Sequence, residues 1–358
     1  MNILIDIGHP AHVHLFRFFA DGMRAKGHQV VFTVRNKENE IRLLESFGLQ
    51  YALVGKHHKS IPGKIMGLIL SVAKACKVVK ETRPDIFVSH GSIIAAVTSW
   101  ISRRPHISLE DTGNHEQVRL YLPFTEAVLT SLAFHRDYGR KQVRYNSFHE
   151  LAYLHPKYFK PDKHFRQKLG VEENEKLIIV RFVSWHATHD KNSTGLSDAE
   201  KTDLVRALTA WGRVMISSEQ TLSEELERHK YHMPPETIHH ALACADLFIG
   251  EGATMASECA MLGTPAIYIN SQIAGTINEQ ARNGLIFQFP GFAGTIDKAG
   301  EILAMDRSLE FFREIREKML AGKTDLTALM VWFIENWPES FRQAKADPAF
   351  EKEFIVRI

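Results

Sequence analysis

The chain has 358 residues, of which 44% are hydrophobic and 24% are charged, and its formal net charge is +2. This length fits two domains better than one, the composition is typical of a soluble globular protein, and the small net charge gives no reason to expect a nucleic-acid partner. The three cysteines, Cys76, Cys244 and Cys259, match neither a disulfide framework nor a metal site, which favours a reduced, cytoplasmic location.

Strand and helix patterns alternate from the N-terminus, which predicts an α/β protein with parallel sheets. The first strand covers residues 2–7. It contains Asp6 and no basic region precedes it, so we expect no signal peptide. A turn over residues 8–12 leads to a helix over residues 14–26. The other strands predicted in this half cover residues 29–34, 51–54, 85–89, 106–109 and 127–130, the last of which is expected to end the sheet.

The predicted helix over residues 62–82 has a basic face. Its lysines are Lys64, Lys74, Lys77 and Lys80. The longest apolar run of the chain, near residues 65–73, is ended by Lys74 and is too short to span a bilayer. We expect either a solvated face over a core-facing apolar stripe, which is the commoner case, or peripheral contact with an anionic membrane surface.

Three histidines, His9, His12 and His14, follow the first strand, where ligands of doubly wound domains bind. The pKa of an unperturbed imidazole lies near neutrality, so His12 is a candidate general base. The alternative is that these histidines cap the following helix or bind substrate without proton transfer.

Polar residues also follow two later strands. Ser92 ends a His-Gly-Ser sequence, and Glu110 and Asp111 come directly after the strand over residues 106–109. Glu110 could orient a histidine or contact a sugar hydroxyl, or it could cap the next segment as a loop carboxylate. Because the carboxyl ends of parallel strands share one edge, we expect these residues to line the same cleft as the histidines.

A second strand–helix series begins at residue 177, after a connection over residues 134–175 that is rich in polar residues, prolines and aromatics. Its predicted elements are strands over residues 177–182, 214–217, 247–249 and 266–269 and helices over residues 197–211, 222–228 and 254–261. We therefore expect two doubly wound, Rossmann-like domains that face each other across a cleft, at residues 1–150 and 165–336. A helical extension over residues 337–358 is expected to pack on the first domain.

The segment LFIGEGATMASECAMLGTPAIYI, residues 247–269, has the pattern of strand, glycine turn, helix and strand. A helix that starts just beyond the carboxyl end of a strand directs free N–H groups and a positive dipole at a ligand, which suits a pyrophosphate. Gly252, Ala253 and Thr254 are the candidate pyrophosphate contacts. Glu258, about one turn into the helix, is a candidate ribose contact.

The sequence WHATHD follows a predicted strand and contains three potential metal ligands, His186, His189 and Asp190. Its position favours a loop and no further ligand can be named, so we expect hydrogen bonding to phosphate here and no metal. His186 is expected to line the cleft. Arg181 and Ser184 belong to the same strand-to-loop region, and Arg181 has the alternative role of a structural salt bridge.

Three signatures of phosphate sites are missing from the sequence, namely GxxxxGK[ST], a complete GxGxxG and Asp-x-Asp. The chain therefore lacks a P-loop, a dinucleotide fingerprint and the ligands of a metal-bridged diphosphate of that type. A nucleoside diphosphate would have to be held by helix N–H groups and side chains, without a metal or another cofactor.

With these motifs assembled, the chain resembles the GT-B superfamily of nucleotide-sugar enzymes, and within it an uncharacterised prokaryotic family catalogued as domain of unknown function 354. The motifs that carry the resemblance are DIGHPAHVH (residues 6–14), SLEDTG (108–113), RYNSFHELAYLHP (144–156) and GEGATMASECAMLGTPA (250–266). They span most of the chain up to about residue 288. The last motif is specific to the superfamily but not to one reaction.

One better-known branch of this superfamily is the N-acetylglucosaminyltransferase that completes the peptidoglycan lipid precursor. Its loop histidine is similar to His12, although the glycines that precede it in that enzyme are largely missing here. Its ribose-contacting helix glutamate falls on Glu258, and its later acidic–glutamine segment is similar to Glu279 and Gln280. The resemblance therefore adds Glu279 and Gln280 to the candidate nucleotide-sugar contacts.

A second branch is the non-hydrolysing UDP-N-acetylglucosamine 2-epimerase. Its His-Val-Glu loop resembles the segment that ends at Glu110. Its His-Gly-Asp motif, however, is His-Gly-Ser in this chain, so Ser92 stands where epimerase chemistry would use a carboxylate. This departure makes an epimerase less expected than a transferase, but it does not exclude a related reaction.

The motifs and the resemblance together predict an inverting, metal-independent glycosyltransferase whose donor is a nucleoside-diphosphate sugar, with UDP as the expected nucleotide. We expect a glycan or lipid-linked acceptor, as in surface polysaccharide or glycolipid synthesis, and His12 as the base. The alternatives are a nucleotide-sugar 2-epimerase or hydrolase and a non-catalytic nucleotide-sugar-binding protein. The oligomeric state, the sugar and the acceptor are left open by the sequence.

Overall fold

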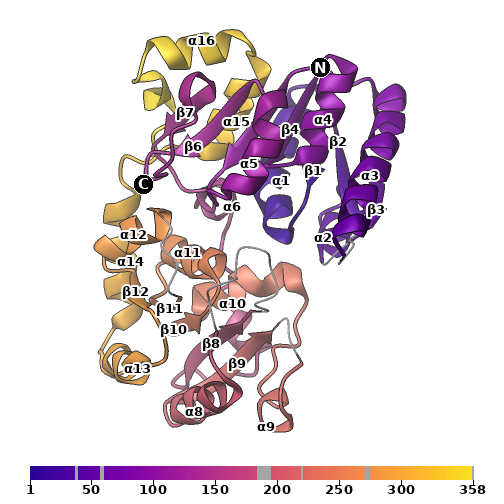
Figure 1. The fold of residues 1–358 in the computed structure, drawn as a ribbon. Helices are drawn as coiled ribbons and strands as arrows, with labels where there is room; N and C mark the ends of the chain where they lie inside the picture. Colours follow the sequence, from indigo (N-terminus) through magenta and orange to yellow (C-terminus); the bar gives the residue numbers. More distant parts are fainter. Residues whose placement is uncertain (37–38, 57–59, 184–194, 219–220, 271–274, 357–358) are drawn as a thin grey trace. The chain divides into compact units, whose positions relative to one another are not determined.

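A computed structural model describes residues 1–36, 39–56, 60–183, 195–218, 221–270 and 275–356. The chain divides into two compact units (Figure 1). The N-terminal unit comprises Met1–Tyr153 and Gly322–Val356, and the C-terminal unit comprises Leu154–Ala321. None of the described helices combines enough length with enough apolar sequence to cross a membrane.

The N-terminal unit contains a parallel sheet of seven strands in the order β3-β2-β1-β4-β5-β6-β7. The strands are β1 Asn2–Ile7, β2 Gln29–Asn36, β3 Tyr51–Lys56, β4 Ile86–His90, β5 His106–Glu110, β6 Ala127–Ser131 and β7 Gln142–Tyr145. Strands β1, β4, β5 and β6 are almost wholly buried, as expected for a sheet covered on both faces. The strand order reverses between β1 and β4, which is where doubly wound sheets bind ligands.

Helices from both ends of the chain belong to this unit. They are α1 Pro10–Ala25, α2 Glu40–Ser46, α3 Ile61–Thr82, α4 Ile93–Ser102, α5 His115–Tyr121, α15 Leu326–Glu335 and α16 Glu339–Ala346, and α6 Leu151–Leu154 contains the point where the chain leaves the unit. Helix α15, drawn in yellow in Figure 1, packs against α1. The two helices approach closely at Gly22, which has no side chain. A Cβ at this position would lie only 3.0 Å from Cγ2 of Val331.

The C-terminal unit contains a second parallel sheet of five strands in the order β12-β11-β10-β8-β9. The strands are β8 Lys176–Phe182, β9 Gly212–Ser218, β10 Leu247–Gly250, β11 Ala266–Ile269 and β12 Ile286–Phe289. The helices are α7 Phe165–Lys168, α8 Asp198–Thr209, α9 Glu224–Glu227, α10 Ile238–Cys244, α11 Ala253–Leu262, α12 Gly275–Arg282, α13 Thr295–Ala304 and α14 Ser308–Leu320. The strand order reverses between β8 and β10, so this sheet is also doubly wound.

The predicted fold class, two doubly wound parallel α/β units, is confirmed, but several boundaries differ. Helix α1 begins at Pro10, because His9 caps it and proline suits the first helical turn, so His12 lies in the helix and not in a turn. The prediction that residues 127–130 end the first sheet is wrong, since β7 follows within the predicted connection. Strand β12 was not predicted. The chain returns to the N-terminal unit at Gly322, earlier than the expected extension at residue 337.

Candidate functional site

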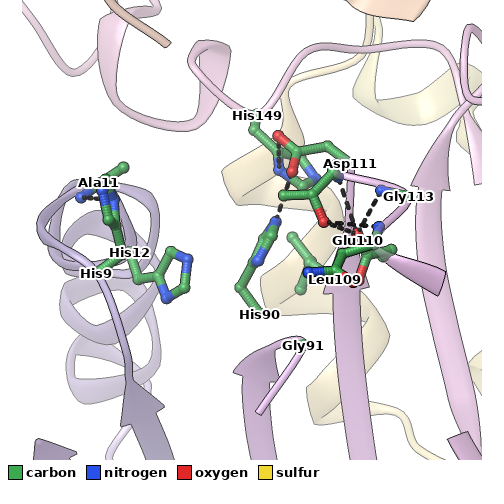
Figure 2. Close-up of polar contacts among 12 residues, drawn as sticks. His9, Ala11, His12, His90, Gly91, Leu109, Glu110, Asp111, Gly113 and His149 are labelled. Atoms are coloured by element: carbon green, nitrogen blue, oxygen red, sulfur yellow. Dashed lines mark hydrogen bonds and ion pairs between the residues drawn. The ribbon is translucent and has the colours of Figure 1, made fainter. Parts of the chain in front are cut away.

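A cluster of three histidines and one carboxylate lies at the carboxyl edge of the N-terminal sheet. His12 comes from the first turn of α1, His90 from the end of β4, Asp111 from the loop after β5, and His149 from the segment after β7. Asp111 joins two of the rings, with Oδ1 at 2.8 Å from Nε2 of His90 and Oδ2 at 3.0 Å from Nδ1 of His149. Figure 2 shows the ring of His12 on the other side of His90, with 4.5 Å between the two ring centroids.

The electrostatics of this cluster favour a charged His90 beside a neutral His12. Burial lowers the pKa of His90, but the charge and hydrogen bond of Asp111 outweigh burial and raise this pKa to about 9. Burial likewise raises the pKa of Asp111, but the charges of His149 and His90 outweigh it and hold the Asp111 pKa well below its usual range. Burial, together with His90 and His9, lowers the pKa of His12 well below its usual range.

His12 is therefore a neutral imidazole at pH 7, and its hydrogen bonding assigns the tautomer. Nδ1 accepts a hydrogen bond from the amide of Gly8 at 3.3 Å, which places the ring proton on Nε2. For His12 to accept a proton at Nε2, this proton has to move to Nδ1 and the Gly8 hydrogen bond has to be given up. The contact is long, so exchanging the tautomer requires only a weak hydrogen bond to be lost.

Glu110 is buried and its carboxylate is occupied by hydrogen bonds within its own loop. Oε1 accepts from the amide and hydroxyl of Thr112, at 2.8 and 2.6 Å, and from the amide of Gly113 at 3.0 Å, while Oε2 accepts from the hydroxyl of Tyr121 at 2.7 Å. Figure 2 shows the bonds to the loop after β5. These contacts favour the interpretation of Glu110 as a loop-capping carboxylate that holds the adjacent Asp111 in place.

Ser92 has a structural position at the start of α4. Its hydroxyl accepts from the amide of Ala95 at 3.1 Å and donates to Oδ2 of Asp6 at 2.6 Å. The other oxygen of Asp6 accepts from the hydroxyl of Thr33 at 2.6 Å. Burial raises the pKa of Asp6, against the hydrogen bonds from Ser92 and Thr33. The sequence placed Asp6 in a motif but did not mark it as a functional residue.

The other two histidines of the α1 region have structural positions. Nδ1 of His9 accepts a hydrogen bond from the amide of Ala11 at 3.2 Å and caps the helix (Figure 2), which is the alternative role expected for these histidines. His14 was expected to line the cleft, but it is buried in the core between Phe47 and Tyr153. Helical spacing explains this difference, because His14 falls on the buried face of α1.

His149 was not recognised as a functional candidate from the sequence. It follows β7, a strand of only four residues inside a segment predicted to be a connection, so the periodicity did not place it at a sheet edge. Its ring is buried and stacks on Tyr145 with 6.3 Å between ring centroids. The motif RYNSFHELAYLHP contains this histidine. The sequence pattern did not show that the motif begins in a strand and that His149 follows the end of that strand.

The ligand atoms of His90, Asp111 and His149 lie within 4.8 Å of one another, so these three side chains could hold a metal ion such as zinc. Their geometry is also that of two N–H···O hydrogen bonds to one carboxylate. In the part of the chain that the structure describes, no fourth histidine, cysteine or carboxylate joins the group. A three-residue site would leave at least one coordination position to water or substrate.

The C-terminal unit places the glycine turn of residues 250–252 as predicted, at the carboxyl end of β10. A Cβ at Gly250 would lie 2.7–3.0 Å from atoms of Phe248 and Arg181, so this position requires glycine. Gly252 is the N-cap of α11 and provides no side chain to cap it. The helix starts at Ala253, and the amides of its first turn, including that of Thr254, lie at the sheet edge.

Arg181 lies beside this turn. It pairs with Gly250 across β8 and β10, and its Cγ lies 3.9 Å from the position of a Cβ on Gly252. Its Nη1 donates to the hydroxyl of Ser217 at 2.8 Å. The aliphatic part of Arg181 therefore passes the start of α11, while its guanidinium contacts β9, on the other side of β8. The predicted neighbours Ser184 and His186, with the rest of the WHATHD sequence, lie outside the described residues.

The remaining nucleotide-sugar candidates are partly or wholly buried. Glu258 accepts a hydrogen bond from Nε2 of His239 at 3.0 Å, and both side chains are buried between α10 and α11. Gln280 is completely buried and donates to the hydroxyl of Ser257 at 2.6 Å, which ties α12 to α11. Glu279 is half-buried. Burial of Gln280 favours a structural role over the predicted ligand contact.

Two doubly wound parallel α/β units, with candidate binding residues at the carboxyl edge of each sheet, define the GT-B fold. Within this class, the chain belongs to the family described as "Protein of unknown function (DUF354)", whose model matches residues 1–321. A relative from Methanocaldococcus jannaschii, described as "Uncharacterized protein MJ0665", is 21% identical over 280 residues, which cover 75% of this chain and 81% of the relative.

Solved structures confirm the fold. The UDP-GlcNAc 2-epimerase from Neisseria meningitidis, bound to UDP-GlcNAc, is similar with a TM-score of 0.63 and 11% identity, covering 96% of this chain and 100% of that chain. The glycosyltransferase SsfS6 from Streptomyces sp. SF2575 is similar with a TM-score of 0.58 and 14% identity, covering 94% and 100%. The fold is thus shared with both epimerases and glycosyltransferases, and the choice between reactions depends on the residues of this chain.

Proposed function

We propose that the protein is a metal-independent glycosyltransferase that uses a nucleoside-diphosphate sugar, UDP-linked, as its donor. The observation that carries this proposal is the start of α11, where a glycine N-cap leaves the first-turn amides without a capping side chain. Arg181 of the neighbouring strand β8 passes this turn with its aliphatic part and is the candidate cation of the same sheet edge. Helix amides and a guanidinium are the groups that bind a pyrophosphate and stabilise the charge that develops on a leaving diphosphate.

Each unit has a distinct part in the proposed reaction. In the C-terminal unit, the amides of Ala253 and Thr254 bind the pyrophosphate beside Gly252. The expected ribose contact of Glu258 requires the donor to reach a buried carboxylate that already accepts from His239. In the N-terminal unit, His12 takes the proton from the acceptor hydroxyl as the new glycosidic bond forms and the nucleoside diphosphate leaves. Burial, His90 and His9 lower the pKa of His12 in the free protein, so its ring is neutral and able to accept a proton.

A nucleotide-sugar 2-epimerase or hydrolase is the second candidate, and one contact favours it. Ser92 replaces the carboxylate of the epimerase motif, but the carboxylate of Asp6 lies 2.6 Å from its hydroxyl. Burial raises the pKa of Asp6 above its ordinary value, which is the direction that acid–base chemistry near neutral pH requires. The third candidate, a non-catalytic nucleotide-sugar-binding protein, shares the donor site and lacks turnover.

Two measurements test the proposed function. A thermal-shift series with UDP, TDP, GDP and their sugar conjugates identifies the donor, because a ligand that binds only the native state raises the melting temperature. Mass spectrometry of the products then separates the candidates. Unchanged donor in the absence of acceptor supports obligatory transfer, an isomerised or hydrolysed donor supports the second candidate, and stabilisation with no turnover across an acceptor panel supports the third.

We also propose that the protein acts in the cytoplasm on a glycan or lipid-linked acceptor, as surface polysaccharide or glycolipid synthesis requires. A cytoplasmic location agrees with three cysteines that form no disulfide in this chain. Activity toward lipid-linked acceptors in the same mass-spectrometric assay tests the acceptor class.

A further inference from the structure

Helix α3 carries an exposed apolar patch on its outer face. The patch consists of Ile65, Met66, Ile69 and Leu70, whose exposed fractions are 59%, 56%, 57% and 53%. These four residues lie within six consecutive positions, yet they are four of the thirteen large apolar side chains that are exposed in the described residues. Scattered exposed apolar residues need no explanation, whereas a contiguous group indicates a binding surface.

The patch is not needed for the packing of the N-terminal unit. The opposite face of α3 supplies Leu68, Val72 and Ala75, which pack with Val54 of β3 and Ile94 of α4. The helix therefore has two apolar faces, and the fold buries only one of them. In Figure 1, α3 lies at the side of the N-terminal unit, beside β3 at the end of the sheet.

Lysines continue the outer face beyond the patch. Lys74, Lys77 and Lys80 are exposed along the second half of α3, and Lys64 is exposed at its start. The acidic residue of the helix is Glu81, so its four lysines and one glutamate give a net charge of +3. Met66, Ala73 and Lys80 are spaced by seven residues and thus lie on one side of the helix, with the apolar end and the basic end in line.

We propose that this face of α3 binds the surface of an anionic lipid bilayer. The helix would lie in the plane of the interface, with the apolar patch in the boundary between headgroups and acyl chains and the lysines among the anionic headgroups. A bilayer surface of this kind supplies apolar depth and negative charge together, and these match the apolar patch and the lysines of the outer face. The proposal does not depend on the proposed transferase activity.

A second copy of the chain fits this surface less well. In a two-fold contact centred on the patch the same apolar residues would meet each other, and the lysines of the outer face would gain no row of acidic partners. Four half-exposed side chains also provide much less than the ~800 Å² per partner that stable interfaces bury. The charge of the outer face therefore favours a negatively charged lipid surface over self-association.

The position of the patch links it to the candidate site of the same unit. Helix α3 follows the carboxyl end of β3, so its first turns, which carry the patch, lie at the sheet edge that also holds His12 and His90. Binding of the patch to a bilayer would bring this edge close to the lipid surface.

Vesicle co-sedimentation of the full chain tests the proposal. We expect the protein to sediment with vesicles of phosphatidylcholine that contain 30% phosphatidylglycerol, to remain in solution with phosphatidylcholine alone, and to lose most binding in 0.5 M NaCl. The double variant Ile69→Gln/Leu70→Gln and the triple variant Lys74→Gln/Lys77→Gln/Lys80→Gln should each weaken partitioning at least tenfold. Thermal melting establishes that both variants are folded.

The matched control is Leu120→Gln, which removes an equally exposed leucine from α5 and should leave vesicle binding unchanged. The proposal is overturned if the wild-type protein stays in the supernatant with anionic vesicles, or if the control weakens binding as much as the α3 variants do. Light scattering provides the competing outcome. A dimer that the Ile69→Gln/Leu70→Gln variant dissociates, without vesicle binding by the wild type, would assign the patch to self-association.

Discussion

Nε2 of His90 lies 2.8 Å from Oδ1 of Asp111, and this pair sets the charge of His90 and, through it, favours the neutral form of His12. The carboxylate holds His90 in its protonated form, with a pKa of about 9, and the resulting positive charge adds to burial in keeping the neighbouring His12 neutral. Asp111 also contacts His149, so one carboxylate positions two rings, one from the end of β4 and one from the segment after β7. The titrations of these side chains are therefore coupled, and a change at Asp111 should alter the pKa of His12 as well.

The first prediction concerns this coupling. In Asp111→Asn the pKa of His90 should fall from about 9 to its ordinary value or below, because burial then acts without the compensating negative charge. The pKa of His12 should rise, because loss of the charge on His90, which lowers this pKa, outweighs loss of the smaller opposite effect of Asp111 itself. NMR titration of the histidine rings measures both. Asp21→Asn, an exposed aspartate of α1, is the control, and an unchanged His90 titration in Asp111→Asn would contradict the assigned pairing.

The second prediction is a dependence of stability on pH. The folded pKa of His90, about 9, lies above its unfolded value of 6.5, so the stabilisation is complete below pH 6.5 and is lost as the pH rises through 9. A difference of this size corresponds to about 3 kcal/mol. Urea denaturation should show the free energy of unfolding decreasing from pH 7 to 9.5 in the wild type and less so in Asp111→Asn. Parallel curves for the two proteins would refute the prediction.

On the acid side, the buried His106 adds to the effects of His12 and Asp111, whose pKa values also lie below their usual ranges. Burial lowers the pKa of His106 to about 3, and its ring nitrogens lie 2.9 and 2.8 Å from the hydroxyls of Ser89 and Thr125. Between pH 6.5 and 3 the unfolded chain binds a proton that the folded chain excludes, so stability should fall as the pH falls. The same urea series measures this, with the variant His106→Gln expected to show a weaker acid dependence.

The fold and its two candidate regions could be predicted from the sequence because both depend on local patterns. The α11 turn combines an apolar strand, a glycine requirement at Gly250 and a helix start, all within one continuous segment. His12 follows β1 directly. Its candidacy required only that a strand end there, although the capping by His9 moved it from a turn into the first helical turn.

The roles of Glu110 and His149 could not be predicted because they depend on distant partners. The sequence around Glu110 does not distinguish a carboxylate that acts on a substrate from one that caps a loop. Its hydrogen bond with Tyr121, eleven positions away, and the loop amides favour the second role. His149 follows β7, and four residues of strand inside a polar segment give too little periodicity to detect.

The third prediction tests the donor site through Arg181. Arg181→Gln removes the guanidinium of the side chain that passes the α11 turn and should weaken binding of the UDP-sugar identified by thermal shift at least tenfold, as expected for loss of a charge-assisted contact. Calorimetry measures the affinity. Arg213→Gln, on the adjacent strand β9, removes an exposed arginine that pairs with Glu175 and should leave affinity unchanged. Equal affinity in wild type and Arg181→Gln would remove this residue from the site.

The fourth prediction separates a hydrogen-bonded triad from a metal site at His90, Asp111 and His149. Purified protein treated with EDTA should retain its activity and its melting temperature, because the two histidine–carboxylate hydrogen bonds need no ion. Elemental analysis of untreated protein should find less than stoichiometric zinc, manganese or iron. A stoichiometric ion that is lost in His149→Ala, with activity restored to EDTA-treated wild type by that metal, would establish the metal centre instead.

The fifth prediction concerns His12 as the base. His12→Asn retains a side chain of similar polarity but removes the imidazole, so kcat should fall about 10²–10⁴-fold while the dissociation constant of the donor changes less than twofold. His9→Asn is the matched control, because His9 caps α1 with its ring and an asparagine can cap a helix as well. Its kcat should stay near that of the wild type.

Proportional losses of kcat and donor affinity in His12→Asn would make His12 a binding residue. Full activity in that variant would mean that another group of the N-terminal unit accepts the proton. Asp6 is the first candidate for that role, because burial raises the pKa of its carboxyl.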